Sequence, residues 1–236
     1  GRDTVLHVDE RRVAELVDAT LARIRGRGDR MFALLMVIQW MGAIAVAGWY
    51  SPQAWSGVAS SPHLHIYAAT ILGGILSGVP IWMAANFPGA AITRQTIAIA
   101  QITWSALLIH LCGGRIETHF HVFGSLAILG WYRDPRVLLT ATLATAFDRA
   151  VRGYFWPESV FGAHAASMWR TLEHSGWVAF ECVFLWASIR ENLRDIQLSC
   201  QMQTKLEQTV ERVEAQVAER TAELNVHAQR LEAAKS

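Results

Sequence analysis

The chain has 236 residues, of which 52% are hydrophobic and 17% charged, and its formal net charge is only +1. Soluble domains carry about a quarter charged residues, so this chain is charge-poor. With a positive mean hydropathy and ten tryptophans, the composition excludes a disordered chain, a fibrous repeat and an ordinary cytosolic enzyme, and it indicates a membrane protein.

The charges divide the chain into three parts. Residues 1–30 hold 13 charges, residues 31–189 hold 13, and residues 190–236 hold 15. We therefore expect an all-α protein with a cytoplasmic amphipathic helix over 1–30 and a six-span transmembrane sensor domain over 31–190. A cytoplasmic coiled-coil helix over 191–236 should lead to an output domain outside this sequence.

The first part carries one apolar stripe. It is formed at helical spacing by Val13, Leu16, Val17, Leu21 and Ile24. With several arginines beside it, the stripe predicts a helix that lies on the membrane surface or against a partner. The alternative is a plain solvated leader helix.

The middle part contains six apolar runs that predict a six-transmembrane-helix bundle. The first is too long for a signal peptide and has no small-residue cleavage site after it. The predicted spans are Met31–Tyr50, His63–Asn86, Ile92–Cys112, Glu117–Trp131, Arg136–Arg152 and Trp169–Ile189.

Loop charges give these spans an orientation. The N-terminal part and the loops around Arg94 and Arg133 are basic, whereas the loop from Ser51 to Pro62 has no charge. Because cytoplasmic loops are enriched in Lys and Arg, both termini are predicted to be cytoplasmic in a bacterial inner membrane.

The pattern of the last part predicts a helical rod that pairs with the same rod of a second copy of the chain. No Pro or Gly follows Ile189, and a heptad seam is formed by Leu206, Val210, Val213, Val217 and Leu224. Arg220 falls on the seam and should weaken it locally. We expect the sixth span to continue into this rod without a break, and the chain to be a homodimer.

Ionisable residues gather at one predicted depth, the outer leaflet, where charged groups are costly and often functional. Imidazoles and carboxylates of this kind are the ligands of transition metals, so we expect a metal or redox-cofactor site here. Arg149 and Arg152 also lie at this level. The candidate ligands are His110, Glu117, His119, His121, Asp148, Glu173, His174 and, deeper in the sixth span, Glu181.

Helical spacing sorts these candidates. Glu117 and His121 share a face at i, i+4, and His119 points about 200° away from them. Other readings stay open: Asp148 could simply neutralise Arg152, and Glu173 could do the same for Arg170. The histidines could also belong to a buried, proton-linked hydrogen-bond network, and His63 and His65 could be simple interfacial residues.

The metal could be copper, zinc or iron, with Cys112 as an added ligand for copper. A haem between two histidines is a further option. The sequence shows no phosphate-binding loop, no nucleophile elbow and no nucleic-acid-binding feature.

The stretch from Ile109 to Gly124 contains a Glu-x-His-x-His motif, and Trp131-Tyr-Arg-Asp-Pro-Arg136 follows it. These residues, with Trp169–His174, resemble the polytopic N-terminal membrane sensor modules of bacterial sensor histidine kinases. Val217–Leu224 is similar to the signalling helix that precedes many kinase domains. The resemblance implies a downstream kinase domain and a response regulator as partners.

The sequence thus favours the sensory half of a membrane histidine kinase, itself without a catalytic domain. The lipid bilayer and a second copy of the chain are its expected neighbours. One alternative is a membrane-embedded metalloenzyme, either a hydrolase or a di-metal oxidase. Another is a structural dimerisation module in which the polar cluster only holds helices together.

Overall fold

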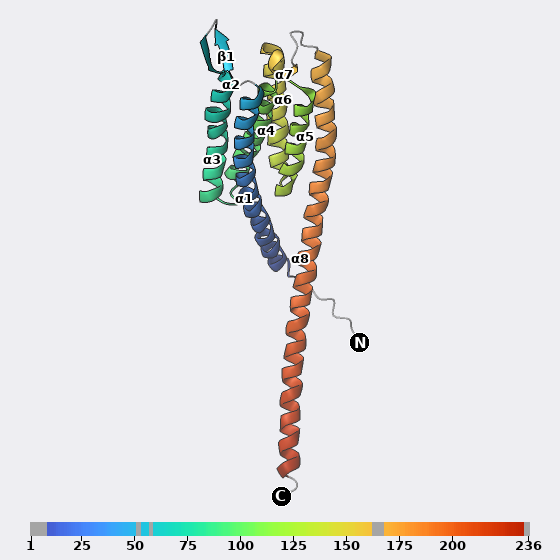
Figure 1. Ribbon diagram of the computed structural model, residues 1–236. Coiled ribbons are helices and arrows are strands. Elements are labelled where there is room, and N and C mark those ends of the chain that lie inside the picture. Colours follow the sequence, from blue (N-terminus) through green and yellow to red (C-terminus); the bar gives the residue numbers. More distant parts are fainter. Residues whose placement is uncertain (1–8, 51–52, 57–58, 162–167, 234–236) are drawn as a thin grey trace. The chain divides into compact units, whose positions relative to one another are not determined.

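The computed structural model describes residues 9–50, 53–56, 59–161 and 168–233. Contacts divide the chain into two units: Leu21–Asn192, called the bundle unit here, and Gly1–Thr20 with Leu193–Ser236, called the tail unit. Two long helices contribute to both, α1 over Glu10–Tyr50 and α8 over Met168–Ala233. The expected continuity of the sixth span with the C-terminal rod is therefore confirmed (Figure 1).

Helices account for almost all of the bundle unit, as expected for an all-α protein. The chain order after α1 is α2 (Leu64–Tyr67), a π-helical turn (Ala68–Leu72) and α3 (Gly73–Asn86). Then come α4 (Ala91–Leu111), α5 (Ile116–Leu129), a 3-10 turn (Gly130–Tyr132), α6 (Pro135–Phe155) and α7 (Glu158–Phe161). Helix α4 packs against α3, α5, α6 and α7, and it contributes buried side chains along its whole length.

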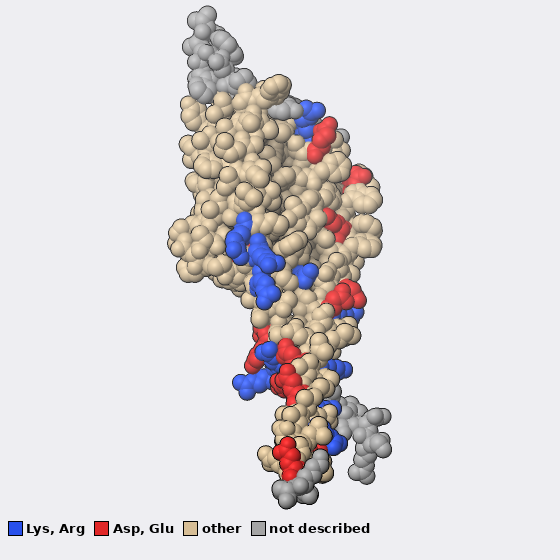
Figure 2. Space-filling view, turned by 60° about the horizontal axis from the view of Figure 1, so that its bottom comes forward, with Lys and Arg blue, Asp and Glu red and all other residues tan. Residues whose placement is uncertain are grey.

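Each predicted span is almost entirely helical, although the second is divided among α2, the π-helical turn and α3, and the first and sixth are parts of the longer α1 and α8. Within the described part of the chain, two stretches are long and apolar enough to cross a membrane, Glu10–Trp49 and Leu64–Asn86. The crossing of the other four helices stays a prediction. In the space-filling view, much of the visible bundle surface carries no Lys, Arg, Asp or Glu (Figure 2).

Two local features differ from the expected arrangement. The amphipathic segment is not a separate element, because α1 runs from Glu10 through the first predicted span. The loop after it contains an antiparallel hairpin of β1 (Gln53–Ser56) and β2 (Ala59–Pro62), with Gln53 opposite Pro62. His7 and His164 lie outside the described residues.

Turn chemistry ends the helices where the sequence indicates. Gly113 and Gly114 both have a positive φ, 67° and 73°, at the turn between α4 and α5, a backbone conformation that suits glycine. Helix α6 begins with Pro135 in its first turn, and the Asp134 side chain accepts a hydrogen bond from the Arg136 backbone N–H.

A buried polar cluster joins α1 to two turns of the bundle unit, the one between α3 and α4 and the one between α5 and α6. The fully buried Asp29 accepts hydrogen bonds from the Tyr132 hydroxyl at 2.8 Å and from the Gly89 N–H at 2.5 Å. Arg94 donates to the Gly89 carbonyl at 2.6 Å and to Asp134 at 2.9 Å. We call these five residues the Asp29 cluster.

Two tryptophans pack tightly on the start of α3. A Cβ added at Gly73 would lie 2.8 Å from Trp104 Cη2 and 3.0 Å from Trp40 Cδ1. Because both rings would have to move, we expect Gly73→Ala to lower the free energy of unfolding by about 1–3 kcal/mol. Gly78→Ala is the matched control, since no atom lies within 4 Å of its Cβ position. Thermal unfolding in detergent compares the two, and equal melting temperatures would contradict the prediction.

In the tail unit, the start of α1 packs on α8. Val13, Ile196 and Cys200 are buried, and Arg12 forms an ion pair with Glu207 at 3.2 Å. Val13, the first residue of the predicted apolar stripe, is therefore buried within the chain itself.

The Glu207 ion pair makes this contact dependent on pH. Hydrogen bonds from Gln203 and Arg12 lower the pKa of Glu207 below its ordinary value. A lowered pKa in the folded state means that the pair stabilises above the unfolded pKa of about 4.3 and is lost as pH falls through the lower, folded pKa. We expect Glu207→Gln to melt slightly below wild type at pH 7. The difference should vanish at the acid end of a melting series, and a gap that persists there would contradict the assignment.

Candidate functional site

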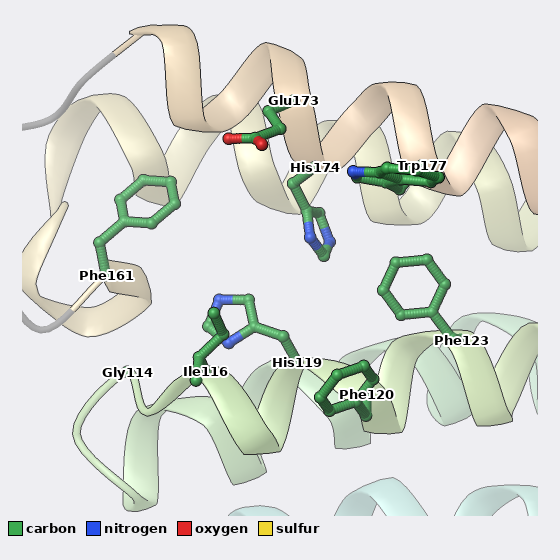
Figure 3. Close-up of a pocket in the computed structure, with 9 residues that line it drawn as sticks. All are labelled: Gly114, Ile116, His119, Phe120, Phe123, Phe161, Glu173, His174 and Trp177. Atoms are coloured by element: carbon green, nitrogen blue, oxygen red, sulfur yellow. The ribbon is translucent and has the colours of Figure 1, made fainter.

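The bundle unit contains a cavity of ≈ 690 Å³ between α5, α7 and α8. Figure 3 shows the side chains that surround it, with His119 and His174 pointing toward each other from facing helices. Four aromatic rings supply most of its apolar wall. The lining residues are Gly114, Ile116, His119, Phe120, Phe123, Phe161, Glu173, His174 and Trp177.

Ring contacts and hydrogen bonds hold the two imidazoles of this cavity. Their centroids are 5.5 Å apart in an edge-to-face arrangement, and Phe123 packs edge-to-face on His174 at 5.5 Å. His119 Nδ1 lies 3.0 Å from the Arg115 carbonyl oxygen, which fixes the ring orientation. His174 Nε2 is buried and has no hydrogen-bond partner in the part of the chain that the structure describes.

His121 faces away from this cavity into a separate polar network. Its Nε2 lies 3.0 Å from Gln39 Nε2, and its Nδ1 lies 2.8 Å from the Ser105 hydroxyl. Ser125 and Gln101 continue the network by hydrogen bonds of 3.1–3.3 Å. Both ring nitrogens of His121 are therefore within hydrogen-bond distance of described side chains. The helical spacing correctly placed His119 and His121 on different faces.

His110 belongs to a third group. Its Nδ1 lies 2.9 Å from the Ser159 hydroxyl, and its ring contacts those of His65 and Trp156. Arg152 also donates to Ser159, at 3.1 Å. His63 packs on His65 with ring centroids 4.3 Å apart.

Asp148 is fully engaged by one neighbour. Arg152 donates to both carboxylate oxygens, at 2.6 and 2.7 Å, as the i, i+4 spacing allows. The structure therefore contains the Asp148–Arg152 ion pair that the sequence offered as an alternative to metal binding by Asp148. The corresponding pairing of Glu173 with Arg170 lies outside the described side chains.

The remaining candidates do not join a common centre. Glu117 is exposed and pairs with Arg115 at 3.5 Å. Glu181 Oε2 is buried and has no hydrogen-bond partner among the described residues, and Glu181 does not line the cavity. Within residues 9–50, 53–56, 59–161 and 168–233, no three His, Cys, Asp or Glu side chains are grouped so as to hold a metal ion. The predicted metal site thus stays a prediction.

The sequence predicts Arg149 at the level of the candidate ligands but assigns it no role. Its side chain is 2% exposed, and among the described residues none of its three guanidinium nitrogens has a hydrogen-bond partner. The guanidinium interacts electrostatically with both His119 and His174. If α6 crosses the membrane as predicted, a buried arginine within it is a candidate functional residue.

Comparison with known proteins places the chain near signal transducers. It is 26% identical over 152 residues to transducer protein Htr8 of Halobacterium salinarum, a match that covers 64% of this chain and 23% of that protein. The chain therefore matches about a quarter of the relative. No protein-family model and no solved structure matches it. The similarity supports a role in signal transduction in general.

Proposed function

We propose that the chain is the sensory and transmitting part of a dimeric membrane signalling protein, and that the His119–His174 cavity receives the stimulus. One observation carries the proposal: the same continuous helix, α8, lines the cavity with His174 and Trp177 and then presents an apolar seam. A ligand that binds one arrangement of α8 more tightly than another would shift the equilibrium toward that arrangement. The C-terminal rod belongs to the same helix and would change with it.

Exposed apolar side chains support the membrane setting. Leu34, Met41, Ile75, Phe147 and Phe184 are each 58–71% exposed on helices of the bundle unit. So much apolar surface is unfavourable in water and suits lipid. In our proposal all six helices span the membrane, with the arginine-rich loops and both termini in the cytoplasm.

The seam supports a dimer and an output partner. Leu206, Val210, Val213 and Val217 are 46–65% exposed on α8, an arrangement that a second α8 would cover. The transducer similarity and the signalling-helix pattern both favour an output domain after the rod. We propose a histidine kinase domain, which would act on a response regulator.

A metal in the cavity is a narrower form of this proposal. His119 and His174 would supply two imidazoles, and Glu173 would have to change its position to add a carboxylate oxygen, because these three side chains are not grouped as a metal site in the structure. The electrostatic effect of Arg149 on His174 opposes a cation there. Elemental analysis and an optical spectrum of the purified protein test it. Turnover of a lipid or quinone would instead favour the metalloenzyme.

Transmission can be tested in membranes. In a background without native cysteines, two chains of Val213→Cys protein can crosslink through the introduced thiols, and the crosslinking rate reports the state of the seam. We expect His174→Ala to change this rate about fivefold or more, the lower range of allosteric couplings. Val183→Ala, an exposed α8 position outside the cavity, should leave it unchanged. Equal rates with and without His174→Ala would refute the proposal.

A further inference from the structure

A second, smaller pocket of ≈ 290 Å³ lies in the bundle unit between α1, the turn after α5 and α8. Measured contacts place its walls. A Cβ added at Gly28 of α1 would lie 3.2 Å from Trp131 Cδ1. In the same turn, a Cβ added at Gly130 would lie 3.9 Å from Leu185 Cδ2 of α8. The turn therefore touches α1 on one side and α8 on the other, and the pocket opens between them.

The lining of this pocket combines one cation with an apolar wall. Arg133 lines the pocket, and among the described residues no Asp or Glu does so. The described part of the chain offers the Arg133 guanidinium no ion pair. Ser188 Oγ accepts a hydrogen bond from Asn192 at 3.4 Å, so its own hydroxyl hydrogen stays available to a ligand. Leu185 contributes to the apolar wall. A lining of this kind suits an anion that is attached to hydrocarbon.

The backbone of Arg133 is a second indication that its side chain is used. The residue has φ 50° and ψ 38°, the left-handed conformation, which costs free energy for any residue with a Cβ. Glycine adopts this conformation more easily. An arginine held at such a position indicates a function for the guanidinium, because strained residues persist where the strain serves a site.

The predicted topology places the pocket at the cytoplasmic boundary of the membrane. Trp131 and Ile189 line the pocket and are the last residues of the predicted fourth and sixth spans. Trp131 is 53% exposed, as suits a side chain among lipid headgroups. Basic segments at this boundary attract anionic lipids. The arginines that flank the lining residues in sequence are Arg23, Arg25, Arg136 and Arg190.

We propose that this pocket binds the headgroup of an anionic phospholipid, with its phosphate on Arg133 and the Ser188 hydroxyl and the start of an acyl chain against Leu185. The planar guanidinium matches two phosphate oxygens at once. The inference rests on the membrane setting of the proposed function, which alkaline extraction of membranes tests separately. If the protein stays in the extracted membranes but shows no lipid preference, this inference alone is overturned.

Native mass spectrometry measures the preference directly. The protein is released from micelles that contain equal amounts of phosphatidylglycerol and phosphatidylcholine. We expect about fivefold more phosphatidylglycerol adduct, the ratio that one arginine near a lipid surface contributes. Arg133→Gln should bring the two adducts to about equal amounts.

Arg136→Gln is the matched control, because Arg136 is exposed nearby in sequence but does not line the pocket. It should leave the ratio unchanged. Equal losses in the two variants would show diffuse attraction to a basic surface, and they would overturn the pocket. Equal adducts in the wild type would overturn the proposal as well.

Soluble phosphates separate a lipid from a free anion. In neutral detergent, phosphatidylglycerol should raise the melting temperature of the wild type, because a ligand that binds only the folded state stabilises it. Inorganic phosphate and glycerol 3-phosphate at the same concentration should not, since they lack the part that contacts the apolar wall. Equal stabilisation by the lipid and by a soluble phosphate would overturn the lipid assignment.

Arg133→Gly separates binding from folding. Because glycine adopts the left-handed conformation more easily, this variant should melt no lower than the wild type in neutral detergent. Added phosphatidylglycerol should not raise its melting temperature. A lower melting temperature together with an unchanged adduct ratio would show that Arg133 has a structural role only, and would overturn the proposal.

Discussion

Asp134→Asn is expected to lower the free energy of unfolding by about 3–5 kcal/mol, because it removes one partner of a buried ion pair. The side chains of Arg94 and Asp134 are only 7% and 11% exposed, with Nη2 and Oδ2 2.9 Å apart. Asparagine preserves the hydrogen bond that Oδ1 accepts from the Arg136 backbone, so the cap of α6 is retained and the loss of charge is isolated.

The control is the replacement of a carboxylate by an amide in an exposed ion pair. Glu15 pairs with Arg11 at 3.7 Å on the surface, where the two side chains are 57% and 90% exposed. We expect Glu15→Gln to cost less than about 1 kcal/mol, since exposed pairs are weak. Reversible unfolding in mixed micelles measures both variants.

A double variant tests the cause. If Asp134→Asn is destabilising because it leaves the Arg94 charge uncompensated, adding Arg94→Met should recover much of the loss. If the double variant does not recover stability, the loss comes from the Asp29 cluster as a whole, including the hydrogen bond that Arg94 donates to the Gly89 carbonyl. A loss below about 1 kcal/mol for Asp134→Asn would contradict a buried pair altogether.

The sequence predicted the helices well because local signals define them. Uncharged runs end at Gly113 and Gly114 or before Pro135, and the structure ends or begins helices there. The continuity of α1 through Gly26 and Gly28 was harder to predict, since glycines in a charged stretch suggest a break. Gly28 is needed for packing instead: a Cβ there would lie 2.9 Å from Tyr132 Cε1, an atom far away in sequence.

In the candidate site, too, some features could be predicted from the sequence and others could not. Helical phase sufficed to separate His119 from His121, because the face on which a helical residue lies follows from residue spacing. The Asp29 cluster was missed, since it joins residues up to 103 positions apart through side chains that carry no motif. For Arg149 a signal existed: the i, i+4 spacing gives Asp148 to Arg152 and leaves the adjacent arginine without its nearest anion. The sequence could not show that the Arg149 guanidinium lacks a hydrogen-bond partner among the described residues, because this depends on tertiary packing.

Val210→Asp combined with Val213→Asp is expected to weaken the proposed dimer about 100-fold or more, because four carboxylates would meet in the seam predicted between two copies of α8. The two valines are 46% and 50% exposed in the single chain and belong to the predicted a and d positions. Sedimentation equilibrium in detergent measures the change. Ala215→Asp with Ala218→Asp adds the same charge on the outer face of α8 and should leave the dimer intact.

Arg220 allows the opposite change at the same seam. It falls on a predicted d position and forms an exposed ion pair with Glu223 at 3.0 Å, so the predicted seam lacks one apolar layer there. Arg220→Leu should restore that layer and tighten the dimer, since leucine is favoured at d. If the aspartate pair leaves the protein dimeric and Arg220→Leu changes nothing, the copies associate through the bundle unit. In that case the rod would have to transmit its signal without a coiled coil, and the exposed valines would need another partner.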